Sequence, residues 1–358
     1  YDTISALDAD IKTFTFDGDT PQNARKKIRE AGHIVVTNPD MLHSGILPHH
    51  TRWVKLFENL KYVVIDELHH YRGVFGSHLA NVIRRLKRLL RFYNSDVQFI
   101  CSSATIANPI ELAERLLEEK VELLDKNGAP RSEKHFILYN PPVVNQQLGI
   151  RKSALLSARK IASQIIANDI QTIVFVPYRV ATEILLTYLR TDLRGKIDAN
   201  NAIFGYRGGY LPNERRKIEQ GLRSGAIRGV VSTNALELGI DIGQLQAAVL
   251  TGYPGSVAST LQQAGRAGRN QGISLVIMVA NSSAINQFIV NNPDYLFGRC
   301  VESGVVDPDN FVILTSHLKC AAFELPFEKG EKYGVETTSE ILDYLARRGV
   351  LRFTGDKY

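Results

Sequence analysis

The sequence predicts an α/β protein whose strands form parallel sheets in two lobes. Short β-branched runs alternate with longer segments of helical periodicity, which is the pattern of parallel strands joined by helices. Most of the runs are apolar along their whole length, as expected for strands that helices cover on both faces. The candidate strands are residues 34–37, 62–65, 98–101, 172–176, 229–232, 247–250 and 274–279.

The clearest helix is predicted from about Ser77, a good N-cap residue, to about Arg91. Its apolar residues recur at steps of three and four and make one stripe. They are Leu79, Val82, Ile83, Leu86, Leu89 and Leu90. We interpret the cations that lie mostly off this stripe as a solvated helix surface, with a nucleic-acid-binding face as the alternative. These cations are Arg84, Arg85, Lys87, Arg88 and Arg91.

Three parts are predicted along the chain. The segment Tyr139-Asn140-Pro141-Pro142 and the polar stretch after it are typical of a linker, so we expect a first lobe at residues 1–140 and a second at 141–300. After residue 279 the alternation of strands and helices stops. Residues 339–348 are predicted to form a helix that Gly349 ends at the C′ position, and residues 350–355 could begin a hairpin. A helix followed by a hairpin predicts that 301–358 is a connector and the start of a winged-helix domain.

Composition limits the class of protein. A chain of 358 residues is long enough for two full hydrophobic cores, and it contains no apolar run that approaches a membrane span. The formal charge of +6 suits a polyanionic partner, with simple solubility as the alternative. The three cysteines, Cys101, Cys300 and Cys320, lie far apart, which argues against a zinc site or a disulfide framework in this stretch and fits a reducing cytoplasm.

Acidic residues directly follow one of the predicted strands. Residues 62–65 lead into Asp66-Glu67-Leu68-His69, which places both acids at the carboxyl end of a parallel strand, where α/β sheets bind ligands. An Asp at this position can hold Mg²⁺ through water, and the adjacent Glu can deprotonate a water that attacks a γ-phosphate. A surface acidic pair is the alternative.

Two further motifs follow strands in the predicted second lobe. Residues 232–241 read Ser-Thr-Asn-Ala-Leu-Glu-Leu-Gly-Ile-Asp, and residues 262–269 read Gln-Gln-Ala-Gly-Arg-Ala-Gly-Arg. Arg266 and Arg269, three residues apart, are expected on one helical face, from which both could reach the same phosphate. A salt-bridge cluster is the alternative, but the glycines that flank both arginines argue against it.

In this order, the segments 66–69, 102–105, 232–241 and 262–269 resemble motifs II, III, V and VI of superfamily 2 helicases. The chain is most similar to the DEXH-box DNA helicases typified by bacterial mitomycin repair factor A and the fungal RecQ4-like repair helicases. This closer resemblance rests on residues 66–86, 206–215, 232–241 and 317–326, so it spans nearly the whole chain. It implies two tandem RecA-like lobes followed by a partial winged-helix segment.

The resemblance implies a role for individual residues. Asp66 would bind Mg²⁺, Glu67 would be the catalytic base, and His69 would couple the ATP site to neighbouring motifs. Ser103 and Thr105 would link hydrolysis to lobe movement. The residues that would complete the ATP site from the second lobe are Gln262, Arg266, Arg269, Gly239 and Asp241, the last near the ribose. The residues that would contact the nucleic-acid backbone are Thr37, Pro39, Asp40, Arg179 and Thr233.

The sequence departs from the family pattern in its phosphate-binding loop. The pattern Gly-x-x-x-x-Gly-Lys-Ser/Thr does not occur, since the only Gly-Lys, at Gly195-Lys196, is followed by Ile197. We expect the loop to precede Tyr1 and a cysteine-rich module, with zinc or another metal, to follow Tyr358. The chain alone is therefore expected to bind ATP weakly and to hydrolyse it negligibly.

The function that the resemblance implies is an ATP- and Mg²⁺-dependent DNA helicase, moving 3′→5′ in DNA repair. It would be a cytoplasmic, nucleoid-associated protein, with a repair nuclease as a candidate partner and no membrane association. An RNA helicase is one alternative, although DEAD-box RNA helicases usually carry His where this chain has Gln262. The other alternative is that this chain is a non-catalytic nucleic-acid-binding fragment.

Overall fold

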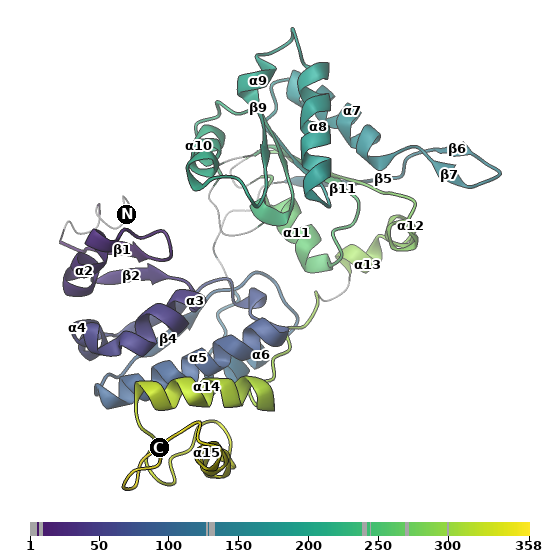
Figure 1. Cartoon of the computed structure of the whole chain (residues 1–358). Coiled ribbons are helices and arrows are strands. Elements are labelled where there is room, and N and C mark those ends of the chain that lie inside the picture. Colours follow the sequence, from purple (N-terminus) through teal and green to yellow (C-terminus); the bar gives the residue numbers. More distant parts are fainter. Residues whose placement is uncertain are drawn as a thin grey trace. The chain divides into compact units, whose positions relative to one another are not determined.

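A six-stranded, fully parallel sheet organises the second half of the chain in the computed structural model, which describes residues 6, 10–126, 128, 133–237, 242–243, 245–268, 272–298 and 301–358. The strand order is β5-β12-β11-β8-β10-β9. The strands are β5 (Lys134–Tyr139), β8 (Thr172–Phe175), β9 (Ile203–Tyr206), β10 (Gly229–Ser232), β11 (Ala247–Thr251) and β12 (Ser274–Val279). A short antiparallel pair, β6 (Val143–Asn145) and β7 (Ile150–Arg151), extends away from this sheet (Figure 1).

Both faces of this sheet are buried under helices, which explains the continuous apolar runs. On β8, Val174 packs on the side of α7 and α8, whereas Ile173 packs on the side of α10, α11 and α12. The helices are α7 (Ala154–Ala167), α8 (Arg179–Asp192), α9 (Ala199–Ala202), α10 (Pro212–Arg223), α11 (Val257–Gly265), α12 (Ala284–Asn291) and α13 (Asp294–Phe297). The prediction of a helix-covered parallel sheet is confirmed.

The first half of the chain contains two parallel strand pairs. β1 (Thr13–Phe16) pairs with β2 (Ile34–Thr37), and β3 (Tyr62–Ile65) pairs with β4 (Gln98–Cys101). The strands predicted at 34–37, 62–65 and 98–101 are confirmed with those bounds. The helical elements are α2 (Gln22–Ala31), α3 (Pro39–Met41), the π-helix η1 (Leu42–Ile46), the 3₁₀-helices η2 (Leu47–Arg52) and η3 (Leu68–His70), α4 (Val54–Asn59), α5 (Gly73–Phe92) and α6 (Pro109–Leu117).

The central helix α5 begins at Gly73, four residues before the predicted N-cap Ser77. The hydroxyl of Ser77 donates to the carbonyl of Gly73 at 2.8 Å and accepts from the backbone N–H of Asp307 at 2.9 Å. The prediction of the helix start was therefore wrong. The serine instead is the fifth residue of the helix, and its hydroxyl holds a segment from the C-terminal part of the chain.

The chain divides into two compact units, one comprising residues 1–123 and 303–358 and the other residues 124–302. The predicted linker at Tyr139–Pro142 lies inside the second unit, because Tyr139 ends β5 and pairs with Val279 of β12. Within the first unit, the C-terminal segment, with α14 (Phe311–Glu324) and α15 (Thr338–Arg347), packs against the N-terminal part, where α14 lies beside α5 (Figure 1).

Three of the cations predicted as a solvated surface on α5 are buried by this packing. Arg84, Arg85 and Arg88 are 5%, 0% and 6% exposed, and we call them the arginine row. Each forms an ion pair with an acid of the C-terminal segment, namely Asp309, Glu324 and Glu331 respectively. The prediction of a solvated surface was wrong for these three, because helical periodicity cannot show that acids more than 200 residues away cover that face.

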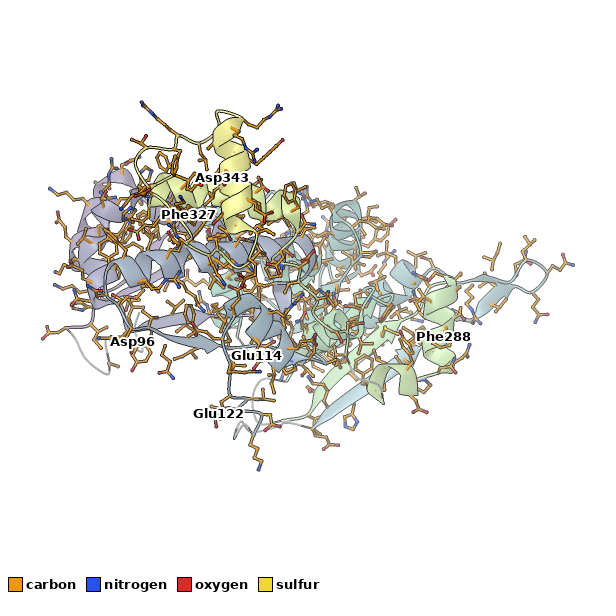
Figure 2. All side chains as sticks on the ribbon, turned by 90° about the horizontal axis from the view of Figure 1, so that it is seen from below. Asp96, Glu114, Glu122, Phe288, Phe327 and Asp343 are labelled. Atoms are coloured by element: carbon orange, nitrogen blue, oxygen red, sulfur yellow. The ribbon has the colours of Figure 1, made fainter. Side chains whose placement is uncertain are left out.

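The C-terminal segment has its own small core, to which Leu318, Phe327, Tyr333 and Leu342 contribute. Phe327 is fully buried against the guanidinium of Arg88, and Asp343 lies on α15; both are labelled in Figure 2. The predicted helix near 339–348 and its glycine C-cap are confirmed, since α15 ends at Arg347 and Gly349 has a φ of +72°. Thr354 and Lys357 then exchange backbone hydrogen bonds in a tight turn.

Candidate functional site

The ends of β3 and β4 are hydrogen-bonded to each other at the predicted acidic motif. The register pairs Ile65 with Cys101, so Asp66 and Ser102 follow side by side. Asp66 Oδ1 accepts from the Ser102 hydroxyl and, at 2.9 Å, from the backbone N–H of Glu67. The backbone N–H of Leu68 donates to Ser102 O at 2.8 Å. Sequence reasoning gave Ser102 no role, although equal strand lengths would have placed it opposite Asp66.

Glu67 has a left-handed backbone, with φ 54° and ψ 45°. This conformation costs a non-glycine residue about 1–2 kcal/mol, so the surrounding bonds must hold it. Two of the bonds described above do so: the N–H of Glu67 donates to Asp66 Oδ1, and the N–H of Leu68 donates to Ser102 O. The Glu67 side chain therefore leaves the strand end in a fixed direction, and about one-third of it is exposed.

His69 connects the acidic motif to the next one along the chain. Its ring is 5% exposed, and Nδ1 accepts the backbone N–H of Ala104 at 3.1 Å. Burial, followed by the nearby charges of His70 and Arg72, lowers the pKa of His69 to about 4. The ring is therefore neutral at pH 7 with its proton on Nε2, and the 3.5 Å approach of Glu67 Oε2 to Nδ1 is not an ion pair.

This low pKa predicts a pH dependence of stability. The unfolded chain protonates a histidine near pH 6.5, whereas folded His69 stays neutral to about pH 4, so the unfolded state binds more protons between those values. The stability that His69 contributes is fully present above pH 6.5 and is lost as the pH falls towards 4. An NMR titration of the ring should give a midpoint near 4, and His69→Gln, which keeps an acceptor for Ala104, should reduce the pH dependence of unfolding. A midpoint near 6.5 would contradict this assignment.

Ser103 and Thr105, predicted as coupling residues, flank the residue that His69 binds. Both side chains are exposed, and the Ser103 hydroxyl donates to Ala104 O at 2.7 Å. The structure therefore brings together Asp66, Glu67, His69 and the segment 102–105 at one edge of the first unit.

The segment Thr37-Asn38-Pro39-Asp40 follows β2 and begins a short helical stretch. Asn38 caps α3 by accepting the backbone N–H of Met41 at 2.8 Å, and the Thr37 hydroxyl donates to Phe16 O at 2.7 Å. Thr37 and Asp40 are exposed. This predicted backbone contact thus has a defined local structure and an accessible surface.

In the second unit, Arg179 and Thr233 follow neighbouring strands. β8 and β10 are hydrogen-bonded to each other, and Arg179 is the first residue of α8, just beyond the end of β8. Thr233 directly follows β10 and caps the turn at 234–236 through the N–H of Ala235. Because both strands are parallel, the two residues lie at the same sheet edge. Arg179 is exposed and Thr233 is 8% exposed.

The helix that carries the last motif ends earlier than predicted. α11 stops at Gly265, so Arg266 lies at the C-cap of the helix and not within it, and Gly268 has a φ of +80°. The prediction that Arg266 and Arg269 lie on one helical face stays a prediction, since Arg269 lies outside the described residues. Arg266 is 4% exposed and donates to Glu237 O through Nε at 3.1 Å and Nη2 at 2.8 Å.

Arg266 therefore links the segment 262–268 to the segment 232–237. Gln263 reinforces this link by donating to Glu237 Oε2 at 2.9 Å, and Gly268 N donates to Leu245 O at 2.9 Å. Sequence reasoning assigned Gln262, which is half-buried, and missed Gln263 and Glu237. Three predicted site residues, Gly239, Asp241 and Arg269, lie outside the described residues.

The described residues contain no group of three or more His, Cys, Asp or Glu side chains that could hold a metal by themselves. Proteins usually hold Mg²⁺ with only one or two carboxylates, while water and substrate phosphates supply the other ligands. Asp66 fits that role because it is exposed and both hydrogen bonds described above use one oxygen, Oδ1. Within the described part of the chain, no helix has the length and apolar character to cross a bilayer.

Comparison with known families agrees with this arrangement. The DEAD/DEAH box helicase family matches residues 2–113, and the helicase conserved C-terminal domain matches residues 157–271. The winged helix domain of ATP-dependent helicase HRQ1 matches residues 306–356. YprA of Bacillus subtilis strain 168, described as an uncharacterized ATP-dependent helicase, is 60% identical over 99% of this chain and 47% of its own length. The chain belongs to the superfamily 2 helicases.

Two relatives define the branch of superfamily 2 helicases to which this one is similar. ATP-dependent helicase HRQ1 of Saccharomyces cerevisiae is 42% identical over 90% of the chain and 31% of its own length. The crystal structure of the DUF1998 helicase MrfA bound to DNA and AMPPNP superposes with a TM-score of 0.94 at 59% identity, covering all of this chain and 51% of that one. The chain spans a third to a half of the length of these relatives. The two RecA-like domains and the winged helix of this superfamily 2 helicase are confirmed.

Proposed function

We propose that the protein is an ATP-dependent DNA helicase that translocates 3′→5′ along one strand and serves DNA repair. The observation that carries the proposal is the link between the ends of β3 and β4, where Asp66 bonds to Ser102 and His69 bonds to Ala104. This link holds an acid pair at the ligand-binding edge of a parallel sheet. The polarity and the repair role rest on the resemblance to helicases of the mitomycin repair factor A type.

In this proposal the acid pair acts on ATP. Glu67 orients and deprotonates the water that attacks the γ-phosphate, from the direction that its left-handed backbone sets. Asp66 would hold Mg²⁺ through water, and the ion would supply positive charge that neutralises the phosphates. Arg266 also donates to the backbone carbonyl of Glu237. A nucleotide that contacts Arg266 would therefore also affect the segment 232–237. The residues that complete the ATP site from the second lobe are Gln262, Arg266, Arg269, Gly239 and Asp241.

The proposed nucleic-acid contacts are Thr37, Pro39 and Asp40 in the first lobe and Arg179 and Thr233 in the second. They would contact the sugar–phosphate backbone, which fixes register without reading bases. Binding should therefore tolerate any sequence and weaken as salt increases. The bond from Ala104 to His69 supports a coupling role for Ser103 and Thr105, because it connects them to the acid pair that would act on ATP.

DNA is favoured over RNA by the relatives of high identity. MrfA structures at 59% and 61% identity are described as bound to DNA. RNA-bound Dbp5 and Mss116 match at only 17–18% identity, which supports the fold alone.

A repair nuclease as partner and a cytoplasmic, nucleoid-associated location follow from the repair role and belong to the same proposal. Because the chain has no Gly-x-x-x-x-Gly-Lys-Ser/Thr pattern, we propose that ATP turnover requires more than these 358 residues.

Unwinding assays on the full-length protein test this function. We expect ATP-dependent separation of a DNA duplex that has a 3′ single-stranded tail and little separation of the same duplex with a 5′ tail. We also expect single-stranded DNA to stimulate ATP hydrolysis several-fold more than RNA of the same sequence. Stronger stimulation by RNA would assign an RNA helicase, and unwinding only from a 5′ tail would contradict the polarity.

A further inference from the structure

The proposed backbone contact at 37–40 leads into a stretch of unusual helix. The π-helix η1 follows α3, and the backbone N–H of Leu47 donates to Leu42 O, five residues earlier. The next such bond would run from residue 48 to His43 O, but Pro48 has no N–H. The Nη2 atom of Arg85 donates to His43 O instead, at 3.1 Å. A side chain of α5 thus holds the backbone that follows the contact segment.

Arg85 uses all of its donors in this network. Nε and Nη2 bind the two carboxylate oxygens of Glu324, Nη1 binds Nδ1 of His43 and, at 3.4 Å, Nδ1 of His317, and Nη2 also binds His43 O. A guanidinium has five N–H groups, and these five contacts account for them. The side chain is 0% exposed, so its geometry is fixed on every side. We call these four residues the Arg85 network.

The Arg85 network joins the two chain segments that make up the first unit. His43 lies three residues after Asp40, whereas His317 and Glu324 lie on α14 in the C-terminal segment. Both histidine Nδ1 atoms accept hydrogen bonds, so both rings are neutral, in agreement with pKa values that burial and Arg85 lower. His317 then donates through Nε2 to Nδ1 of His78 at 3.0 Å. A buried carboxylate of α14 thereby fixes the direction in which Arg85 holds η1.

We propose that His43 and Arg85 are positioning residues for the backbone contact at 37–40, and that Glu324 of α14 sets that position. The C-terminal segment then helps the first lobe to bind the strand, although it contributes no residue to the proposed contact itself. This inference rests on the proposed function, which assigns the contact to Thr37, Pro39 and Asp40. It extends that function by giving the C-terminal segment a role in the affinity of the protein for single-stranded DNA.

The test compares two acids that anchor the same C-terminal segment to α5. Glu324→Gln weakens the Arg85 network, whereas Glu331→Gln weakens the neighbouring Arg88 anchor without touching η1. In the full-length protein we expect Glu324→Gln and His43→Leu to weaken single-stranded DNA binding about tenfold, the size of one charge-assisted hydrogen bond. The KM for ATP and kcat at saturating DNA should stay unchanged. Glu331→Gln should bind DNA as the wild type does, even if its melting temperature falls by as much as that of Glu324→Gln.

Two further variants separate positioning from simple destabilisation. His43→Gln keeps an acceptor for Arg85 and should restore most of the DNA affinity that His43→Leu loses. Combining His43→Leu with Thr37→Val should weaken binding by less than the product of the two single effects, because His43 acts through that contact. Equal losses in Glu324→Gln and Glu331→Gln, or wild-type binding by His43→Leu, would overturn the inference. A wild-type protein that prefers RNA would instead overturn the proposed function.

Discussion

Replacing Glu67 with glutamine should lower DNA-stimulated ATP hydrolysis in the full-length protein by about 10²- to 10⁴-fold, the usual contribution of a general base. Glutamine has the same shape but cannot take a proton from the attacking water. The bonds that hold this strand end, Ser102 to Asp66 and Leu68 N to Ser102 O, do not involve the Glu67 carboxylate. The variant should therefore fold and bind ATP normally. Steady-state ATPase assays with saturating single-stranded DNA measure the effect.

The matched control for this substitution is Glu122→Gln. Glu122 is an exposed acid in the segment after α6, labelled in Figure 2, and its replacement should leave turnover within about twofold of the wild type, as surface changes away from a site usually do. Near wild-type hydrolysis by Glu67→Gln would remove Glu67 as the base. It would also remove the assignment on which the proposed ATPase chemistry rests.

Replacing Arg88 with methionine should destabilise the first unit by about 3 kcal/mol, the lower end of the cost of breaking a buried ion pair. Arg88 binds both carboxylate oxygens of Glu331 at 2.7 and 3.1 Å, donates to Ala321 O at 2.9 Å at the end of α14, and lies 3.7 Å from the ring centre of Phe327. Methionine retains apolar contact with Phe327 but leaves the carboxylate and the carbonyl without this donor. The lower figure applies because Glu331 is partly exposed and water can solvate it.

Urea unfolding of the 358-residue chain, followed with probes in each unit, measures this loss because the two units need not unfold together. Arg91→Met is the control, since Arg91 lies in the last turn of the same helix and is exposed. Its replacement should change stability by no more than about 0.5 kcal/mol. Equal midpoints for Arg88→Met and Arg91→Met would show that the C-terminal segment does not depend on this anchor.

The strands could be predicted from sequence where local pattern and burial agree. Residues 62–65 and 229–232 are short apolar runs bounded by polar residues, and the predicted bounds were correct. β1, with Thr13-Phe14-Thr15-Phe16, and β5, which begins with Lys134-His135, alternate polar and apolar residues or start with charge. They were missed because a strand of a parallel sheet was expected to be continuously apolar. Gly205 similarly interrupts the apolar pattern of β9.

The candidate site was predictable where one strand end fixes it, and not where distant segments meet. Asp66 and Glu67 follow β3 as expected, but the bond from the N–H of Ala104 to His69 joins residues 35 positions apart. Arg266 was placed on a helix that Gly265 ends, because periodicity does not reveal the positive φ of Gly268. The arginine row shows the same limit, since charge alone does not distinguish a solvated cation from one whose partner is far away in sequence.

The arginine row also has a consequence for truncated forms of the protein that lack the C-terminal segment. Its three guanidinium groups occupy adjacent turns of α5, and much of the negative charge that neutralises them comes from Asp309, Glu324 and Glu331. A truncation after residue 302, intended to isolate the two RecA-like domains, would remove these acids and uncover a stripe of positive charge about 6 Å long on a helix that is otherwise covered. Such a fragment would attract any polyanion, and the tighter, salt-sensitive nucleic-acid binding it showed would be an artefact of the cut.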